Sequence, residues 1–428
     1  MVEEKAKEIL KQEEIIRKKK KKNIALYTMY RCFSWDLLFY YAIIYLFLTI
    51  EKGLSPAQYM QFDAFYVLFK CGMQIPCTML IGKIGKRNSL VIANFVLAMH
   101  LLVIIFSQSF IDLLLSQVFC AFAFVTKATC ESDMLYDALE HNEKRGGIFS
   151  KLDGRAMSIY YYLDAVSAVL SGFFFVVNAY IPMVISFVIA FISFIVSTKF
   201  EDIEVRKKVT IKEEMKSIRY AFRGIFHSKR LKSLLVFNGI FVAILRILQT
   251  LRNTILTEIG VEEQYFGVVF AILGILSGIA TRNQGRIHNR FRNKTLAFLS
   301  IPTACSCLVI GLCLFIHLPT QIMYVIVAIG FIIQYIAKGP YYVLIKRYFN
   351  NFTTSQKRVK IATVNNIMEN AIAAILVFVA SYVLEVAPIY DSVVMIGCLA
   401  VGGVVLWLDH MRGRVGLKME EYSKKEIA

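Results

Sequence analysis

Twelve apolar stretches, each long enough to cross a membrane, follow one another along this chain of 428 residues. A helix needs about 20 apolar residues to span the hydrocarbon core of a bilayer, so twelve stretches leave little chain for a water-soluble domain. Hydrophobic residues make up 57% of the chain and charged residues only 19%. The sequence therefore predicts an all-α membrane protein with twelve transmembrane helices. The expected spans are 24–48, 57–82, 88–108, 111–138, 155–178, 179–199, 232–257, 264–283, 295–317, 320–345, 359–385 and 388–408.

Charged residues inside these spans are confined to particular members of the set. An ionised side chain at the bilayer centre costs about 2.5–3.5 kcal/mol, so it is expected to face protein or a water-filled cavity. The third, sixth, ninth and twelfth spans carry essentially no charge and are suited to face lipid. The other spans can surround a polar interior, which is the layout of a solute transporter.

The Lys and Arg residues outside the spans indicate the orientation of the chain. Most of the 49 lie in segments that share one face of the predicted topology, and they give the chain its net charge of +18. Positive residues collect on the cytoplasmic side of membrane proteins, so we expect a multi-pass protein of the cell membrane with both termini in the cytoplasm. Because the basic excess has this explanation, it does not indicate a nucleic-acid partner.

The two halves of the sequence echo each other. The first and seventh spans begin about 208 residues apart, as do the fourth and tenth. Parallel repeats of this kind are typical of one large class of transporters. We predict six-helix bundles over 24–199 and 232–410, a connector over 200–231, and cytoplasmic tails over 1–23 and 411–428.

Two basic segments outside the spans are predicted to be helical. In the connector, apolar residues recur at spacings of 4, 3, 4 and 3, which predicts an amphipathic helix at the inner membrane surface. The N-terminal segment ends in the basic run 17–22. Such a run attracts anionic lipid by about 1 kcal/mol per charge near the surface. A solvated tail is the alternative for this segment.

The short loop after the second span resembles the signature loop of the major facilitator superfamily, which reads roughly G-x-x-x-D-[RK]-x-G-[RK]-[RK]. The chain departs from that pattern where Thr78 replaces the first glycine and Gly82 replaces the acid. The positions that match the signature are Lys83, Gly85, Lys86 and Arg87.

A second match lies around the fourth and fifth spans. Tyr136-Asp137-Ala138-Leu139, followed by Gly154-Arg155, is similar to a "YDxL … GR" element of a bacterial subgroup of the same superfamily. Asp137 and Arg155 fall at the cytoplasmic ends of adjacent helices, where we expect a stabilising ion pair. The resemblance implies two pseudo-symmetric six-helix bundles, a central cavity lined by helices 1, 4, 7 and 10, and a monomeric protein.

Polar residues inside the spans are the candidates for lining that cavity. Lys127 and Glu131 share one helix face, and Arg246, Gln249 and Arg252 recur every three residues. The full set of predicted cavity residues is Arg31, Asp36, Lys127, Glu131, Arg246, Gln249, Arg252, Gln334, Lys338 and Glu369.

Several of these residues have more than one predicted role. Lys127 and Glu131 either serve transport or neutralise each other. The two arginines of the seventh span either meet Asp36 or Asp63 across the bundle or bind an anionic group of the substrate. The candidates for carrying a coupling proton are Asp36, Glu369 and Glu131.

No sequence pattern points to an enzyme. The motifs HExxH, GxSxG and the P-loop do not occur, and no cysteine pair has CxxC spacing. We therefore predict a secondary active transporter that is driven by protons and uses neither a cofactor nor a metal. The sequence does not fix the direction of transport, and export is one of the two directions. The alternatives are a uniporter or importer of an organic anion or zwitterion, a channel, and a membrane sensor that transports nothing.

Overall fold

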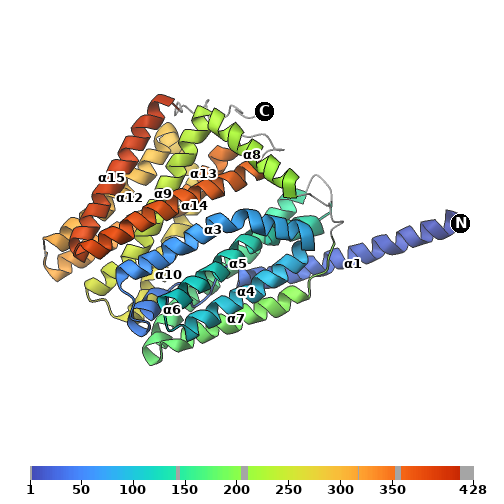
Figure 1. Ribbon diagram of the computed structural model, residues 1–428, viewed down its shortest axis with the longest axis horizontal. Helices are drawn as coiled ribbons and strands as arrows, with labels where there is room; N and C mark the ends of the chain where they lie inside the picture. The colour runs from blue at the N-terminus through green and yellow to red at the C-terminus, as the bar shows by residue number, and fades with distance from the viewer. Residues whose placement is uncertain (1, 141–144, 204–210, 317, 352–357, 415–428) are drawn as a thin grey trace. The chain divides into compact units, whose positions relative to one another are not determined.

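The computed structural model describes residues 2–140, 145–203, 211–316, 318–351 and 358–414. Every regular element within these ranges is helical. The elements, shown in Figure 1, are α1 Val2–Ser34, α2 Ile44–Leu46, the π-helical turn η1 Phe47–Glu51, α3 Pro56–Ile84, α4 Lys86–Phe106, α5 Phe110–Ala138, α6 Arg145–Val177, α7 Tyr180–Thr198, α8 Ile211–His227, α9 Lys229–Glu258, α10 Glu263–Arg282, α11 Gln284–Phe291, the 3₁₀ turn η2 Arg292–Lys294, α12 Thr295–Phe315, α13 Thr320–Asn351, α14 Arg358–Val386 and α15 Ile389–Arg414.

Eleven helices of the described residues are long and apolar enough to cross a membrane. They are α3 to α7, α9, α10 and α12 to α15, and each coincides with one expected span from the second to the twelfth. The prediction of an all-α membrane fold is therefore confirmed.

The first expected span is not one continuous helix. α1 ends at Ser34, and the chain makes turns up to Ile43 before α2 begins. Within this break Phe39 has a φ of 66°, a conformation that bulky residues rarely adopt. The carbonyl of Ser34 accepts a hydrogen bond from Lys127, and that of Leu38 accepts one from Ser186 Oγ at 2.8 Å. The expectation of a single helix over 24–48 was wrong because side chains from α5 and α7 satisfy the carbonyls that the break frees.

The described chain forms two compact units, and their boundaries do not follow the predicted halves. The first unit contains residues 1–43 and 72–211, and the second contains 44–71 and 212–428. The chain therefore passes between the units within the broken first span and again inside α3. Residues 44–71, expected in the N-terminal bundle, pack with the C-terminal helices.

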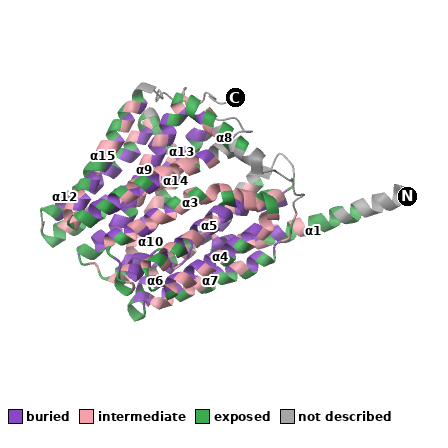
Figure 2. Cartoon of the chain, in the orientation of Figure 1, coloured by how far each residue is buried: buried purple, intermediate pink, exposed green. Residues whose placement is uncertain are grey.

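Each unit has its own packing pattern. In the first, α4 packs on α5 and α7, and α1 packs on α5, α6 and α7. In the second, α9 packs on α14 and α15, while α12 packs on α13 and α15. α9 is the most buried of the membrane helices and is coloured as buried along much of its length in Figure 2.

Glycines allow α12 and α15 to approach closely. A Cβ added at Gly311 would lie 2.8 Å from the backbone nitrogen of Val394, and one added at Gly397 would lie 2.7 Å from the Cα of Leu308. Small residues permit such contacts between membrane helices, where packing replaces the hydrophobic effect as the driving force. The ninth and twelfth spans are therefore held together without charge.

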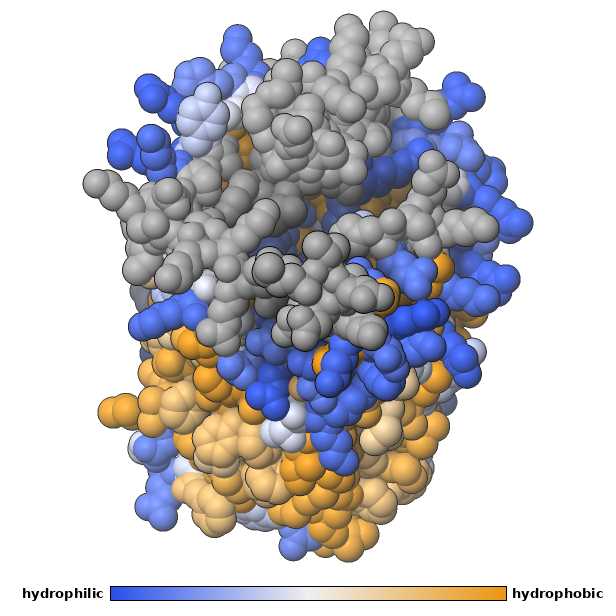
Figure 3. Space-filling view, turned by 90° about the vertical axis from the view of Figure 1, so that its right-hand side faces the viewer, coloured by the Kyte–Doolittle hydropathy of each residue, from blue (hydrophilic) through white to orange (hydrophobic). Residues whose placement is uncertain are grey.

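The four spans without charge present large apolar side chains on their outer surfaces. Examples are Phe95 on α4, Ile192 on α7, Val309 on α12 and Leu406 on α15, all of them exposed. Figure 3 shows such hydrophobic surface beside a face where hydrophilic residues gather. This distribution is what helices in contact with lipid require.

The two basic segments are both helical where described. α8 occupies the predicted connector, and Ile225 of its apolar stripe is buried while Tyr220 on another face is 72% exposed. The N-terminal segment does not form a separate helix, because α1 runs without interruption from Val2 to Ser34 and continues beyond the other helices of its unit (Figure 1). The attraction of both segments to anionic lipid stays a prediction.

Candidate transport site

A buried ion pair joins α1 and α5 in the first unit. Arg31 and Glu131 are 3% and 2% exposed, and Arg31 Nη1 donates to Glu131 Oε2. Glu131 also accepts hydrogen bonds from Tyr30 Oη at 2.9 Å and from Ser34 Oγ at 3.3 Å. Arg31 Nε lies 3.5 Å from a carboxylate oxygen of Asp153 on α6. The two charges compensate each other and Glu131 accepts further hydrogen bonds, while Arg31 Nε is near Asp153 but has no hydrogen-bond partner among the described residues.

Lys127 adds a second cation to this cluster. Its Nζ lies 3.9 Å from Glu131 Oε1, one helical turn away, and donates to the carbonyl of Ser34 at the end of α1. A positive charge is favourable at the C-terminal end of a helix, where carbonyl groups lack helical partners. Lys127 therefore both pairs with Glu131 and stabilises the broken end of α1.

A small cavity lies beside the break in α1. Its polar lining includes Ser34, Asp36, Lys127, Ser186 and Ser193. The Asp36 carboxylate accepts a hydrogen bond from the backbone N–H of Leu37 at 3.1 Å, which holds it in the turn. Asp36 and Lys127, both predicted as cavity residues, thus line the same cavity.

The predicted loop motif connects α3 to α4. Gly85 precedes α4 with a φ of 87°, which glycine adopts without steric cost. Arg87 donates to the backbone carbonyls of Thr198 at 2.6 Å and Phe200 at 3.2 Å, so it closes the C-terminal end of α7. Lys83 of the same motif is exposed.

Lys86, the remaining basic residue of the motif, binds α5. Its Nζ lies 2.6 Å from Asp137 and 3.6 Å from Asp133. The predicted partner of Asp137 was Arg155, which is exposed on α6. The ion pair observed for Asp137 is the one with Lys86, and the pair with Arg155 stays a prediction.

In the second unit, Arg246 on α9 binds Asp63 on α3. The guanidinium donates two hydrogen bonds, from Nε at 2.6 Å and from Nη2 at 3.0 Å, and its Cζ lies 5.2 Å from the ring centre of Tyr66. Of the two acids that the sequence offered as partners, the structure selects Asp63. Such a two-point contact is the strong geometry for an arginine and a carboxylate.

Arg252, two turns further along α9, has a different environment. It is 2% exposed and has no ion pair with any described residue. Its Nη1 donates to the hydroxyl of Tyr335, and Nε has no hydrogen-bond partner. The guanidinium carbon lies 4.2 Å from the ring centre of Phe270 and 4.9 Å from that of Tyr335. Aromatic rings rather than acids therefore surround this cation.

The other predicted residues of the second unit divide between two contacts. Lys338 on α13 donates to Gln249 on α9 at 3.0 Å, and its Nζ lies 5.4 Å from the ring centre of Tyr335. Gln334 does not share this contact. Its side chain is buried and donates a hydrogen bond to Ser306 Oγ on α12 at 3.1 Å. It is a helix-packing residue in this structure and does not join the other predicted cavity residues.

Glu369 belongs to a cluster of neutral polar groups. The amide of Asn238 on α9 donates to the Glu369 carboxylate at 2.7 Å. The carbonyl oxygen of the same amide accepts from the hydroxyl of Tyr341 at 3.0 Å. Glu369 forms no ion pair with any Lys or Arg in the described ranges.

Sequence reasoning missed Asn238 and the aromatic neighbours of Arg252. An amide inside the apolar seventh span was a usable signal, because such a group needs a hydrogen-bond partner at membrane depth. Phe270 and Tyr335 carried no such signal, since aromatic residues are common throughout the chain and usually pack or lie at the membrane interface.

Comparison with known proteins identifies the class. The model of the Major Facilitator Superfamily matches residues 24–378, so the chain belongs to this family of transporters. Among solved structures, a variant of the nucleoside transporter NupG has a TM-score of 0.73 at 13% identity, with 92% of this chain and 99% of that chain covered. A POT family transporter in complex with 5-aminolevulinic acid has a TM-score of 0.68 at 12% identity, with 92% and 96% covered. At these identities the likeness shows the shared fold. No curated protein matches the chain.

Proposed function

We propose that this protein is a proton-coupled secondary transporter that moves a small solute across the cytoplasmic membrane by alternating access. Family membership and the buried charges of both units support a transporter. Such carriers bind the solute near the membrane midplane and alternate between a state open to one side and a state open to the other. The arrangement of basic loops supports cytoplasmic termini.

Glu369 is the residue that we assign to the coupling proton. Its carboxylate is hydrogen-bonded by Asn238 and has no ion pair with a described cation. An ionised carboxylate that forms no ion pair is costly at membrane depth even with Lys70, Lys346 and Arg246 at longer range, so proton uptake removes part of a cost that a paired acid does not carry. The Tyr341 hydroxyl donates to the side-chain carbonyl oxygen of Asn238. This hydrogen bond orients the amide so that its N–H points at Glu369.

The other two predicted proton carriers are less suited to the role. Glu131 is held by Arg31, Lys127 and two hydroxyl donors, and protonation would break those contacts. Asp36 shares its cavity with Lys127, whose charge favours the ionised acid. Asp36 is therefore the second candidate and Glu131 the third.

The test uses proteoliposomes that contain a pH-sensitive dye. A panel of small solutes is screened for proton movement, and the solute with the largest wild-type signal is kept. The Glu369→Gln variant is expected to lose proton movement and pH-driven accumulation while it still exchanges labelled solute across the membrane. Glu385→Gln is the matched control, because Glu385 lies on the same helix, is exposed and accepts a hydrogen bond from Gln61 at 3.2 Å. Proton movement of wild-type size in Glu369→Gln would remove this residue from coupling.

A further inference from the structure

Arg252 carries a charge that nothing in the described chain neutralises. Burying an ion costs several kcal/mol, and proteins usually repay that cost with an opposite charge. Asp63 on α3 was one of the two acids predicted as partners for the arginines of the seventh span. It is already bound by Arg246 through two hydrogen bonds. Cation–π contacts with Phe270 and Tyr335 recover part of the cost but add no negative charge.

The geometry of these contacts leaves one edge of the buried guanidinium without a hydrogen-bond partner among the described residues. The two rings lie near the group, and Nη1 is used by the hydroxyl of Tyr335. Nε has no partner, and no described residue accepts a hydrogen bond from Nη2. Nε and Nη2 form the edge to which a carboxylate or phosphate binds through two parallel hydrogen bonds.

A second cation contacts the same aromatic ring. Lys338 Nζ lies 5.4 Å from the ring centre of Tyr335, and Arg252 Cζ lies 4.9 Å from it. Lys338 is oriented by its hydrogen bond to Gln249. Two positive charges around one tyrosine make this part of the second unit attractive to an anion.

From these observations we infer that the Nε–Nη2 edge of Arg252 binds an oxyanion of the transported solute, which is therefore a small organic anion with a carboxylate or a phosphate group. This inference rests on the proposed transport function and specifies its substrate class. Tyr335 positions the arginine, and Lys338 adds long-range attraction.

Direct binding to the purified full-length protein tests the site without any transport step. The probes are benzoate, phenyl phosphate and benzyl alcohol, which share a ring and differ in the head group. We expect at least one of the two anions to raise the melting temperature of the wild-type protein in a concentration-dependent way, and benzyl alcohol to have no such effect. The anion that binds identifies the head group as a carboxylate or a phosphate.

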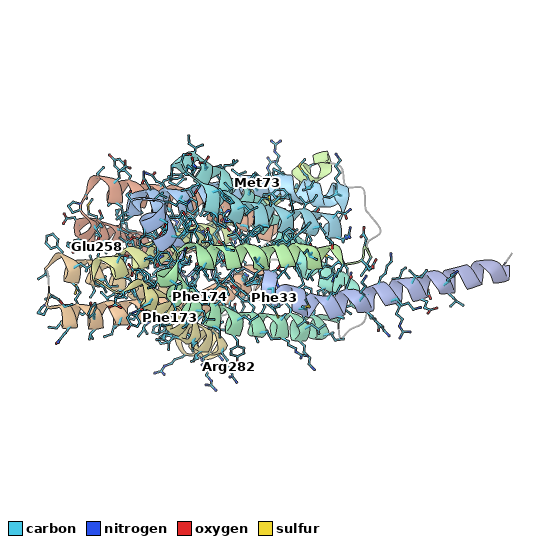
Figure 4. All side chains as sticks on the ribbon, turned by 90° about the horizontal axis from the view of Figure 1, so that it is seen from below. Phe33, Met73, Phe173, Phe174, Glu258 and Arg282 are labelled. Atoms are coloured by element: carbon cyan, nitrogen blue, oxygen red, sulfur yellow. The ribbon has the colours of Figure 1, made fainter. Side chains whose placement is uncertain are left out.

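Three variants connect that binding to Arg252. Arg252→Met is expected to weaken binding of the anion by about tenfold to a hundredfold, the value of hydrogen bonds to a charged group. Arg252→Lys keeps the charge without the planar fork, so it should lie between wild type and Arg252→Met. Arg282→Met is the control, because Arg282 is exposed at the end of α10 and points away from the helices in Figure 4.

The outcomes separate this inference from the proposed function. Equal anion binding by wild type, Arg252→Met and Arg252→Lys would overturn the site, as would a wild-type protein that neither anion stabilises. Anion binding that depends on Arg252, in a protein whose Glu369→Gln variant still moves protons, would support the site while removing the assigned coupling residue.

Discussion

Two arginines at membrane depth, one in each unit, have opposite electrostatic environments. Arg31 in the first unit is paired with Glu131 and lies 3.5 Å from Asp153. Arg252 in the second unit is just as buried, yet its neighbours are Phe270 and Tyr335. A compensated charge can be explained by stability alone, whereas an uncompensated one is kept at a cost. The difference therefore directs attention to Arg252 as the residue whose partner comes from outside the chain.

The largest expected change in the free energy of unfolding follows a substitution in the first unit. Arg31→Met leaves Glu131 buried without its main counter-charge, which should lower the free energy of unfolding by about 3–5 kcal/mol. Thermal and denaturant unfolding of the detergent-solubilised protein measure this loss. The double variant Arg31→Met with Glu131→Leu should recover part of it, since the Arg31–Glu131 pair is then removed whole while Lys127 loses its contact with Glu131. A single variant as stable as wild type would show that the pair is not a structural element.

An intermediate effect is expected for the pair between α9 and α3. The side chains of Arg246 and Asp63 are 27% and 22% exposed, so water screens the charges in part. Arg246→Gln should cost about 2 kcal/mol, between the values for exposed and for buried pairs. A double-mutant cycle with Asp63→Asn measures the coupling energy. A coupling near zero would mean that the two side chains contribute independently.

Substitution of Arg252 should change the free energy of unfolding in the opposite direction. Arg252→Met removes a buried charge that has no acid partner, so we expect no loss and a gain of about 1 kcal/mol in stability without ligand. The same unfolding measurements compare it with Arg31→Met. A loss as large as that of Arg31→Met would break the comparison, because it would reveal a counter-charge for Arg252 within the chain.

The smallest effect concerns a surface pair of the first unit. Lys22 donates to Glu201 at 2.6 Å, and this hydrogen bond lowers the pKa of the Glu201 carboxyl below its ordinary value of 4.5. A lowered pKa in the folded state adds stability above pH 4.5 and loses it as the carboxyl is protonated at lower pH. Because both side chains are partly exposed, Lys22→Met should cost about 0.5 kcal/mol at pH 7. The difference from wild type should shrink as the pH falls below 4.5 and the carboxyl is protonated, and a difference that does not shrink would have another origin.

Some of the candidate site was predictable from residue spacing. Lys127 and Glu131 were expected to meet because they lie one turn apart on one helix, and they do. Asp63 was one of two acids offered to Arg246, and the choice between them depended on which helix packs against α9. Gln334 was predicted to line the cavity together with Lys338, but its amide donates to Ser306 on α12 instead. Spacing fixes which residues share a helix face and leaves open which neighbour that face meets.

The amino-acid order alone determined the membrane class, eleven of the spans and the amphipathic connector, because these depend on apolar periodicity within continuous segments. Tertiary structure decided where the first span breaks, since the freed carbonyls of Ser34 and Leu38 needed donors from α5 and α7. It also decided that residues 44–71 pack with the C-terminal helices and that Arg252 lacks an acid. Such features depend on contacts between segments far apart in the chain, and local sequence does not encode which segments meet.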